Sequence, residues 1–391
     1  MSQLLEAMRE VGEVDLFAVE SARDDLEAGP IAAPGLSRAF VSSRPPFGRE
    51  VRKVLRWLAS PLPRAVLWHQ WDRAAEELRA WASQRYDVVW YSHLAPYLTL
   101  GEEVSAPAEV VDIDNLEDLK LRSMRLIRRA GWMSRSSPVA LVREVFDQVD
   151  ERRWARRQRA AASSVTRVVV CSELDRRRLA VPGTTVIPNG YEREGPPVGR
   201  PVPPASGPVF TMVGLMTYPP NFDAAEHFAR DVLPIVRRQL PGARYHIVGR
   251  GSLERQSVAS LPGVVLRGQV EDIRDELART DVAVVPIRFG GGTRIKVLES
   301  FAHRIPVVAT RTGAEGIDAT DGEHLLLCDD GDAEAMARGC LRLVQDEAFR
   351  LRLVDAAEAR YQERYRWEVI RPRVAALIRE VADETRSRTA S

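Results

Sequence analysis

Cysteines and long apolar runs are both scarce in this sequence of 391 residues. The three cysteines, Cys171, Cys328 and Cys340, show no CxxC spacing, so neither a disulfide scaffold nor a zinc site is expected, and a reducing, cytoplasmic location is favoured. No apolar run reaches the ~18–20 residues of a membrane-spanning helix. The first residues, MSQLLEAMREVGEV, lack the basic start and long apolar core of a signal peptide.

Net charge is nearly absent as well, because 56 basic residues are balanced by 55 acidic ones. A formal charge of +1 gives no global attraction to nucleic acid, so no nucleic-acid partner is predicted. Lysine is rare: only Lys53, Lys120 and Lys296 occur, and every other basic residue in that count is an arginine. The hydrophobic fraction of 45% and the length leave room for two domains with full cores.

Short apolar runs alternate with helical patterns along the chain, which predicts an α/β fold with doubly wound parallel sheets. The runs YDVVWY at 86–91 and VAVVP at 282–286 are typical of buried strands. Helices are expected over most of 49–85 and 116–164, and from 333 to 386. Further strands are predicted at 14–19, 38–42, 109–113, 167–171, 185–187, 209–213, 244–248, 264–267, 307–309 and 325–328.

A segment rich in proline and glycine divides the chain. Pro188, Asn189 and Gly190 form a predicted turn, and prolines and glycines recur from 195 to 208. This composition predicts an interdomain linker at 196–207. The linker would join an N-terminal domain over 1–195 to a C-terminal domain over 208–366.

The stretch 286–316, PIRFGGGTRIKVLESFAHRIPVVATRTGAEG, combines a strand end, a glycine turn and a helix start. Gly290, Gly291 and Gly292 permit a tight turn with exposed backbone N–H groups, and Thr293 is the expected cap of the next helix. Free N–H groups and the helix dipole both favour an anion at such a place. The stretch therefore predicts a phosphate or diphosphate site.

Two cations in the first turn of that helix, Arg294 and Lys296, support the same prediction. Cations oppose the helix dipole at this end, so a bound anion would remove the conflict. Glu299 follows one turn later, and its carboxylate is able to accept hydrogen bonds from the two hydroxyls of a ribose. The alternative is a solvated helix with a Lys296–Glu299 surface pair.

The residues GGGTRIKVLESFAHRIPVVATRTGAEGI resemble the donor-binding signature of the retaining GT-B glycosyltransferases grouped as family 4, in its glycine-rich branch. The resemblance is strong over 207–330 and loose over 86–190. It implies two Rossmann-like domains facing a cleft, a nucleotide-sugar donor on the C-terminal domain, and Glu299 on the donor's ribose. It also implies that the last helix, 367–386, packs on the N-terminal domain. A second acidic residue that the family often has is Gly291 here.

Other positions matched by the resemblance lie at predicted strand ends. Gly214 would let a diphosphate approach the backbone, but the basic residues that usually follow are replaced by LMTY at 215–218, so the positive charge is expected from the glycine-turn helix. A simple strand-to-loop turn is the alternative for Gly214. Gln269 and Val270 are implied to read the base through their backbone. The VGRG sequence at 248–251 lacks a full dinucleotide motif, so no NAD is expected.

Two residues of the N-terminal domain follow predicted strands. By resemblance, Asp114 stands where many family members have a histidine near the donor's anomeric carbon, and a carboxylate there would stabilise positive charge or orient the acceptor hydroxyl. His93 is either a second catalytic candidate or an ordinary strand-end residue. A metal cluster of Asp112, Asp114, Asn115 and Glu117 is the alternative. A hard cation wants about six oxygens, so no metal or other cofactor is predicted.

The family's first domain opens with a strand and a glycine-rich loop, whereas this sequence begins inside the first helix, so that strand is expected to be missing. Together these features predict transfer of a sugar from a nucleotide-diphosphate sugar to a hydroxyl acceptor, with retention and without a metal. The alternatives are a non-catalytic relative that binds nucleotide-sugars, and an epimerase or hydrolase acting on them. The basic run RRWARR at 152–157 predicts either a solvated helix, which is favoured, or weak peripheral contact with a membrane.

Overall fold

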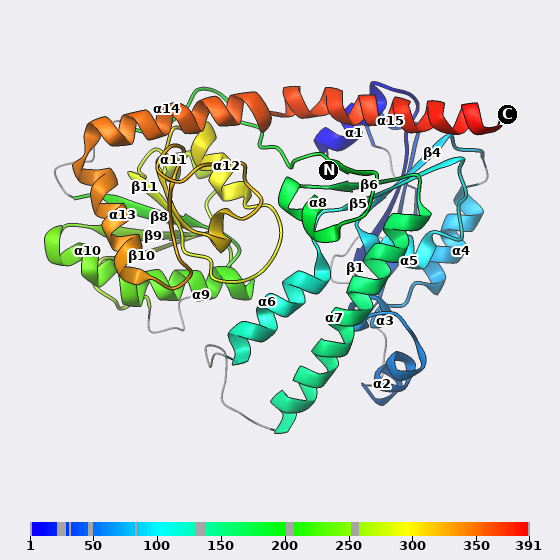
Figure 1. The fold of residues 1–391 in the computed structure, drawn as a ribbon, viewed down its shortest axis with the longest axis horizontal. Helices are drawn as coiled ribbons and strands as arrows, with labels where there is room; N and C mark the ends of the chain where they lie inside the picture. The colour runs from blue at the N-terminus through cyan, green and yellow to red at the C-terminus, as the bar shows by residue number, and fades with distance from the viewer. Residues whose placement is uncertain are drawn as a thin grey trace. The chain divides into compact units, whose positions relative to one another are not determined.

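The computed structural model describes residues 2–21, 29–30, 33–45, 50–82, 84–129, 138–200, 207–251 and 258–389. The chain divides into two compact units, both drawn in Figure 1: unit 1 is Met1–Ile187 with Ile370–Ser391, and unit 2 is Pro188–Val369. Of the predicted linker, residues 201–206 lie outside the described residues. Each unit is an α/β unit with parallel strands, as the alternating pattern predicts.

Unit 2 is built around one parallel sheet of six strands in the order β10-β9-β8-β11-β12-β13. The chain winds outward from β8 in one direction and then returns to lay down β11 on the other side of β8. Ligands of doubly wound sheets bind at the carboxyl ends of strands where the order reverses in this way. The strands are β8 (Val209–Val213), β9 (Arg244–Val248), β10 (Val264–Gly268), β11 (Val282–Val285), β12 (Val307–Thr310) and β13 (Leu326–Cys328).

The helices of unit 2 connect these parallel strands and cover the sheet (Figure 1). One of them, η1 (Phe228–Val232), is a π-helical turn between two α-helices. The others are α9 (Pro219–His227), α10 (Leu233–Gln239), α11 (Ile273–Leu277), α12 (Ile295–Ala302), the 3-10 turn η2 (Thr312–Ala314), α13 (Ala333–Gln345) and α14 (Glu347–Arg364). The single helical region predicted from 333 onward is broken at Asp346, whose side chain accepts from the backbone N–H of Phe349 and starts α14.

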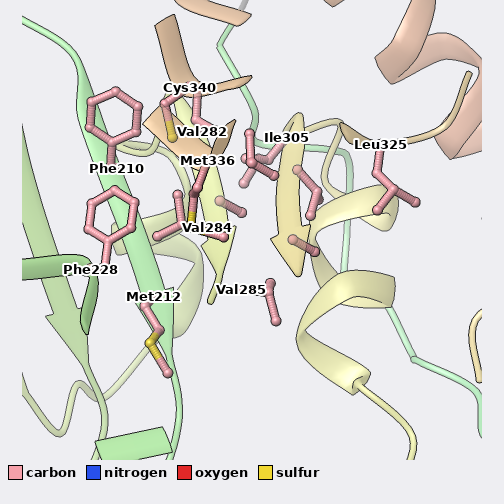
Figure 2. Packing of buried hydrophobic residues seen from close by; sticks show 14 of the residues in the cluster. Phe210, Met212, Phe228, Val282, Val284, Val285, Ile305, Leu325, Met336 and Cys340 are labelled. Carbon is pink, nitrogen blue, oxygen red and sulfur yellow. The ribbon is translucent and has the colours of Figure 1, made fainter. Parts of the chain in front are cut away.

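The core of unit 2 is continuous across the sheet. Figure 2 shows Phe210 of β8 and Phe228 of η1 side by side, and their ring centroids are 6.1 Å apart. Every residue of β11 and β12 is buried, as is typical of parallel strands covered on both faces. This packing fixes where β8 and β11 end, and so fixes the loops that follow them.

Unit 1 has two sheets in its described residues. The first is parallel, in the order β4-β5-β6-β7, and the second has the order β1-β3-β2, with β1 parallel and β2 antiparallel to β3. The strands are β1 (Asp15–Ser21), β2 (Gly29–Pro30), β3 (Arg38–Arg44), β4 (Val88–Ser92), β5 (Ala108–Ile113), β6 (Arg167–Val170) and β7 (Thr184–Val186). Every predicted strand is present with ends that differ by at most two residues, and β2 is an addition to the prediction.

The helices of unit 1 include α15 (Trp367–Thr389), the last helix of the chain. Its Arg371 donates to Glu6 at 2.6 Å, and Arg167 of β6 donates to its Glu380 at 2.8 Å. The other helices are α1 (Ser2–Arg9), α2 (Glu50–Ala59), α3 (Arg64–Leu67), α4 (Asp72–Trp81), α5 (Leu94–Leu100), α6 (Glu117–Arg129), α7 (Pro138–Ser164) and α8 (Glu173–Leu179). None of the helices in the described part of the chain has the length and apolarity that a bilayer crossing needs.

Candidate functional site

Three residues from distant parts of the sequence converge where β8 ends. Gly214 follows β8, Asn221 lies in the first turn of α9, and Lys296 lies at the start of α12. A Cβ atom on Gly214 would stand 2.8 Å from the Asn221 side-chain nitrogen and 3.1 Å from Lys296 Nζ. A glycine here therefore brings the backbone and a lysine ammonium together at the point where the strand order reverses.

The Lys296 ammonium has an uncharged partner. Its Nζ donates to Asn221 Oδ1 at 2.9 Å, and Asn221 Nδ2 in turn donates to the Leu215 carbonyl at 3.0 Å. Burial and the nearby charge of Arg294 together lower the pKa of Lys296 to about 7, although the charge of Glu299 acts in the opposite direction. The alternative of a solvated Lys296–Glu299 surface pair does not describe Lys296, because its ammonium bonds Asn221 and both side chains are partly buried. An incompletely compensated cation of this kind favours a bound anion.

Arg294 holds the glycine turn in place. Its side chain is only 5% exposed and donates to the carbonyls of Gly291 at 2.9 Å, Gly290 at 3.4 Å and Thr312 at 3.1 Å. Gly290 and Gly292 have φ angles of +107° and +88°, a region that favours glycine. Burial lowers the pKa of Arg294. The structure gives Arg294 a structural task, and its predicted contact with a donor diphosphate stays a prediction.

The expected cap at Thr293 is wrong. Helix α12 begins at Ile295 with Arg294 in the cap position, and no side chain caps its first turn. The Thr293 hydroxyl instead accepts a hydrogen bond of 3.1 Å from Asn189 Nδ2. The helix begins one residue later than the sequence suggested because Arg294 is held by the turn that it stabilises.

Glu299 lies one turn into α12 and is half-buried. Burial raises its pKa to about 7, while a hydrogen bond from Tyr191 and the charge of Lys296 act in the opposite direction. Tyr191 lies in the segment that follows β7, just after the predicted Pro188 turn. Glu299 and Lys296 thus lie on the same short helix, and the predicted contact of Glu299 with a ribose stays a prediction.

Gln269 and Val270 follow β10, which is the edge strand of the sheet. Gln269 is exposed and Val270 is half-buried. Gly249 links the end of β10 to Gly214 by two close contacts. Its N–H donates to the Gly268 carbonyl at 2.7 Å, and a Cβ atom on Gly249 would stand 1.9 Å from the Gly214 carbonyl oxygen. The role predicted for Gln269 and Val270 in binding the base stays a prediction.

The two candidates in unit 1 lie at the ends of neighbouring strands. His93 follows β4 and Asp114 follows β5, and the His93 N–H donates to the Asp112 carbonyl at 2.9 Å. His93 is exposed and has a φ angle of +72°, which is uncommon for a residue other than glycine and is often found at functional sites. Asp114 Oδ1 accepts from the Cys171 thiol at 3.0 Å.

Asp112 accompanies Asp114 on the same strand end. Burial, with the charge of Asp114, raises the pKa of Asp112 to about 7. Within the described residues, no group of three or more histidine, cysteine, aspartate or glutamate side chains has the arrangement of a metal site. The candidates of unit 1 are thus carboxylates and one histidine at adjacent strand ends.

Sequence reasoning missed Asn221 and Tyr191. Asn221 is 75 positions from Lys296, so nothing local marks it as the partner of that ammonium. The only available signal was its place in the first turn of a helix that follows Gly214 closely. Tyr191 was passed over because it lies beside the segment interpreted as a linker.

Comparison with known proteins identifies the sequence pattern of unit 2. Residues 207–346 match the family model described as Glycosyl transferases group 1. The chain is 33% identical over 159 residues to LpsE, a lipopolysaccharide core biosynthesis glycosyltransferase of Rhizobium meliloti. This alignment covers 39% of this chain and 44% of LpsE. It is also 31% identical over 157 residues to a phosphatidyl-myo-inositol mannosyltransferase of Mycobacterium leprae. That alignment covers 39% of this chain and 42% of the mannosyltransferase. The matched region spans less than half the length of these curated relatives.

Solved structures resemble nearly the whole chain. Sucrose-phosphate synthase from Thermosynechococcus elongatus matches with a TM-score of 0.67 and 19% identity over 97% of this chain and 92% of that one. Anabaena HepE, in complex with UDP and glucose, matches with a TM-score of 0.61 and 15% identity over 96% and 94%. The chain therefore has the GT-B fold of two Rossmann-like units, and residues 207–346 carry the sequence pattern of glycosyl transferases group 1.

Proposed function

We propose that this chain is a glycosyltransferase that moves a sugar from a nucleotide-diphosphate sugar to a hydroxyl acceptor with retention of configuration. The observation that carries the proposal is the contact of Lys296 with Asn221 beside Gly214, at the strand-order reversal of unit 2. A lysine held there by an uncharged partner offers its charge to an anion, and Glu299 on the same helix offers a carboxylate to ribose hydroxyls.

The leaving diphosphate gains negative charge as the bond to the sugar breaks. Lys296 and the N–H groups after the glycine turn would stabilise that charge in a partly desolvated site, where fixed charges act more strongly than in water. This chemistry needs no metal, and activity is expected to survive chelation. The donor-binding roles of Gly290, Gly291, Gly292, Arg294 and Thr293 are part of this proposal, with Arg294 acting through the turn that it holds.

Asp114 and His93 are the candidates for the acceptor half of the reaction. Asp114 would stabilise positive charge on the sugar or orient the acceptor hydroxyl, and the exposed His93 would exchange a proton with the acceptor. UDP is the first nucleotide to test, because HepE was solved with UDP-glucose and shares the fold. The donor sugar and the acceptor are left for experiment.

The direct test is product analysis. The chain is incubated with UDP-glucose, GDP-mannose, dTDP-glucose or ADP-glucose and a panel of sugar and lipid-linked hydroxyl acceptors, with and without EDTA. The expected result is one glycosylated product whose anomeric configuration, by NMR, equals that of the donor. Lys296→Met should abolish it, and Lys120→Met, which changes another of the three lysines, should leave it intact.

The two alternative functions give different outcomes in the same experiment. Tight nucleotide-sugar binding without any product would identify a non-catalytic relative. Release of free sugar or an isomerised donor without any acceptor would identify a hydrolase or epimerase. Inversion of the anomeric centre would contradict the retaining mechanism while leaving the transferase proposal standing.

Peripheral contact of unit 1 with an anionic membrane surface is a further part of the proposal. Leu55 and Leu58 of α2 are 60% and 62% exposed. Helix α2 packs on α7 through Trp57 and Phe146, whose ring centroids are 4.7 Å apart. The nearby acids Asp147 and Asp150 are buried and form ion pairs with Arg64. Arg52 of α2 is exposed to solvent. Exposed apolar and basic side chains together favour anionic lipid headgroups.

In the basic run predicted for this contact, Arg152 and Arg156 are exposed, whereas Arg153 donates to the carbonyls of Trp57 and Leu62 at 2.9 and 3.0 Å. Sedimentation with vesicles tests the proposal. The chain should pellet with vesicles containing phosphatidylglycerol and not with phosphatidylcholine alone. The double substitution Leu55→Ser with Leu58→Ser should abolish pelleting, and Leu351→Ser in unit 2 should not. Equal pelleting of both variants would contradict it.

A further inference from the structure

A second pair of side chains joins α9 to the segment around the glycine turn. Arg288 lies between β11 and Gly290, and its Nε and Nη2 atoms donate to the two carboxylate oxygens of Asp223 in α9 at 2.9 and 2.6 Å. The two side chains are only 13% and 12% exposed. An arginine that bonds both oxygens of one carboxylate fixes the direction of the contact as well as its distance. The pair therefore differs from a solvated ion pair, which contributes little.

The backbone is closely packed at the same place. A Cβ atom on Gly290 would stand 3.0 Å from Pro220 Cγ and 3.3 Å from the Tyr218 hydroxyl, so the glycine turn lies directly against the start of α9. The start of α9 is tied in turn to the loop after β8. The Asn221 N–H donates to the Tyr218 carbonyl at 3.0 Å, and the Tyr218 N–H donates to the Leu215 carbonyl at 3.1 Å. The loops that follow β8 and β11 therefore meet at the start of α9.

The segment from Arg288 to Lys296 is held by α9 at both ends. Before the glycine turn, Asp223 accepts the two hydrogen bonds of Arg288. After the turn, Asn221 accepts the hydrogen bond of the Lys296 ammonium at 2.9 Å. The spacing between the N–H groups of the glycine turn and the lysine ammonium thus depends on both contacts with α9.

The two phosphate groups of a nucleoside diphosphate make different demands on such a site. One phosphate group is bound by whichever anion-binding element it contacts, whereas two are bound together only where the elements keep a fixed spacing. A spacing that is fixed before binding lowers the cost of ordering the second contact. A nucleoside monophosphate has no second group, so it gains little from that spacing.

We infer that Asp223 and Arg288 are positioning residues that fix the spacing between the glycine turn and Lys296, and that they thereby set how much more tightly the site binds a nucleoside diphosphate than a nucleoside monophosphate. A pair that only stabilised α9 would lie along that helix, as the contact of Arg230 with Glu226 does at 3.1 Å. The Asp223–Arg288 pair instead leaves the helix and ends just before the glycine turn. The inference rests on the proposed donor site.

The experiment measures the affinities of UDP and UMP by calorimetry, or of the corresponding pair for whichever base the chain binds, and compares their ratio between variants. Asp223→Asn keeps the size of the side chain and removes its charge, whereas Arg288→Lys keeps the charge and loses the two-bonded geometry. Each substitution should reduce the preference for UDP over UMP by about tenfold, with little change in the affinity for UMP. The double variant should reduce the preference no further than either single variant, because the two side chains act as one unit.

Two control variants separate positioning from general destabilisation. Glu226→Gln removes a charge from α9 without releasing the segment that α9 holds. Arg304→Met removes the ion pairs that join the loop after α12 to α14, so it should lower the thermal unfolding midpoint. Neither variant should change the ratio of the two affinities.

Two results would overturn the inference alone. One is a ratio in Asp223→Asn and Arg288→Lys equal to that of the wild-type chain. The other is an equal fall of the ratio in Arg304→Met, which would show that any loosening of unit 2 has the same effect. In both cases the wild-type chain would still bind UDP, and the proposed function would stand. Absence of nucleotide binding by the wild-type chain would overturn the proposed function as well.

Discussion

In unit 2 every residue of β11 and β12 is buried, whereas in unit 1 the strand β4 buries only Tyr91 of its five residues. Unit 2 has one six-stranded sheet, and the described residues of unit 1 form separate sheets of four and three strands. A strand covered on both faces has a fixed end, and the residues after it have a fixed position. Gly214, which follows β8, and the glycine turn, which follows β11, therefore lie on a firmer support than His93, which follows β4.

The same difference is visible in how the two groups of candidates are held. Lys296 and Arg294 each have a hydrogen-bond partner from a different segment of unit 2. In unit 1, His93 is exposed, and its recorded hydrogen bond comes from its backbone. We expect binding of the donor to depend on a preformed site, and selection of the acceptor to depend on less constrained residues.

The largest expected effect compares the two cores. Phe228 is fully buried, with its ring 4.4 Å from that of Tyr245, so Phe228→Ala should lower the free energy of unfolding by ~3–5 kcal/mol. Phe17 of unit 1 is only half-buried and stacks on Phe40 at 5.3 Å, so Phe17→Ala should cost about half as much. Urea unfolding midpoints measure both. Equal costs would break the comparison between the two units.

A smaller effect separates the two cations within unit 2. Arg294→Met would remove a buried donor that three carbonyls share and should cost ~2–4 kcal/mol. Lys296→Met removes a buried charge with a neutral partner, so the thermal midpoint should stay unchanged or rise. If the two substitutions destabilise the chain equally, Lys296 is a structural residue, and its burial is no evidence for a ligand.

A third prediction concerns Asp112 in unit 1. Its pKa is raised to about 7 in the fold, above the ordinary value near 4, so the native state keeps a proton that the unfolded state releases. Stability should therefore fall as pH rises from about 4 to 7, with no further loss above that. Asp112→Asn should remove this fall and raise stability at pH 8 by on the order of 1–2 kcal/mol, but not at pH 4.

Asp87→Asn is the matched control for Asp112→Asn, because Asp87 has a side chain that is 75% exposed. It should leave the pH dependence of the unfolding midpoint unchanged. Thermal unfolding at pH 4, 6 and 8 measures both variants. A pH-independent effect of Asp112→Asn would show that its carboxyl is not protonated in the fold.

The last expected effect is the pH dependence of diphosphate binding to unit 2. The pKa of Lys296 is lowered to about 7, so its charge is lost as pH rises above that value. The affinity for 2′-deoxy-UDP, which depends less on Glu299, should fall by at most about tenfold for each pH unit between 7 and 9. Lys296→Arg should remove this dependence, because an arginine stays charged. A flat profile in the wild-type chain would mean that another group binds the diphosphate.

The strands of both units were predictable because their apolar runs are continuous or lie between clear turns. The candidate donor site was proposed from the sequence because a lysine in an arginine-rich chain follows a glycine turn. The partners were not. Asn221 is 75 positions from Lys296 in the sequence, so no local pattern marks it as the partner of that lysine. The prediction that Thr293 caps the helix was wrong, because the buried Arg294 occupies the cap position and the helix begins one residue later, at Ile295.

The most direct test of the donor site is a calorimetric titration of the chain with UDP, GDP, dTDP and ADP, beside Lys296→Met and Lys120→Met. The account predicts that one nucleotide binds the wild-type chain and Lys120→Met equally, and that Lys296→Met weakens it by about 100-fold without loss of thermal stability. Binding of that nucleotide by Lys296→Met at wild-type affinity would contradict the account. Absence of binding by the wild-type chain would contradict it as well, and would leave the glycine turn as a structural corner.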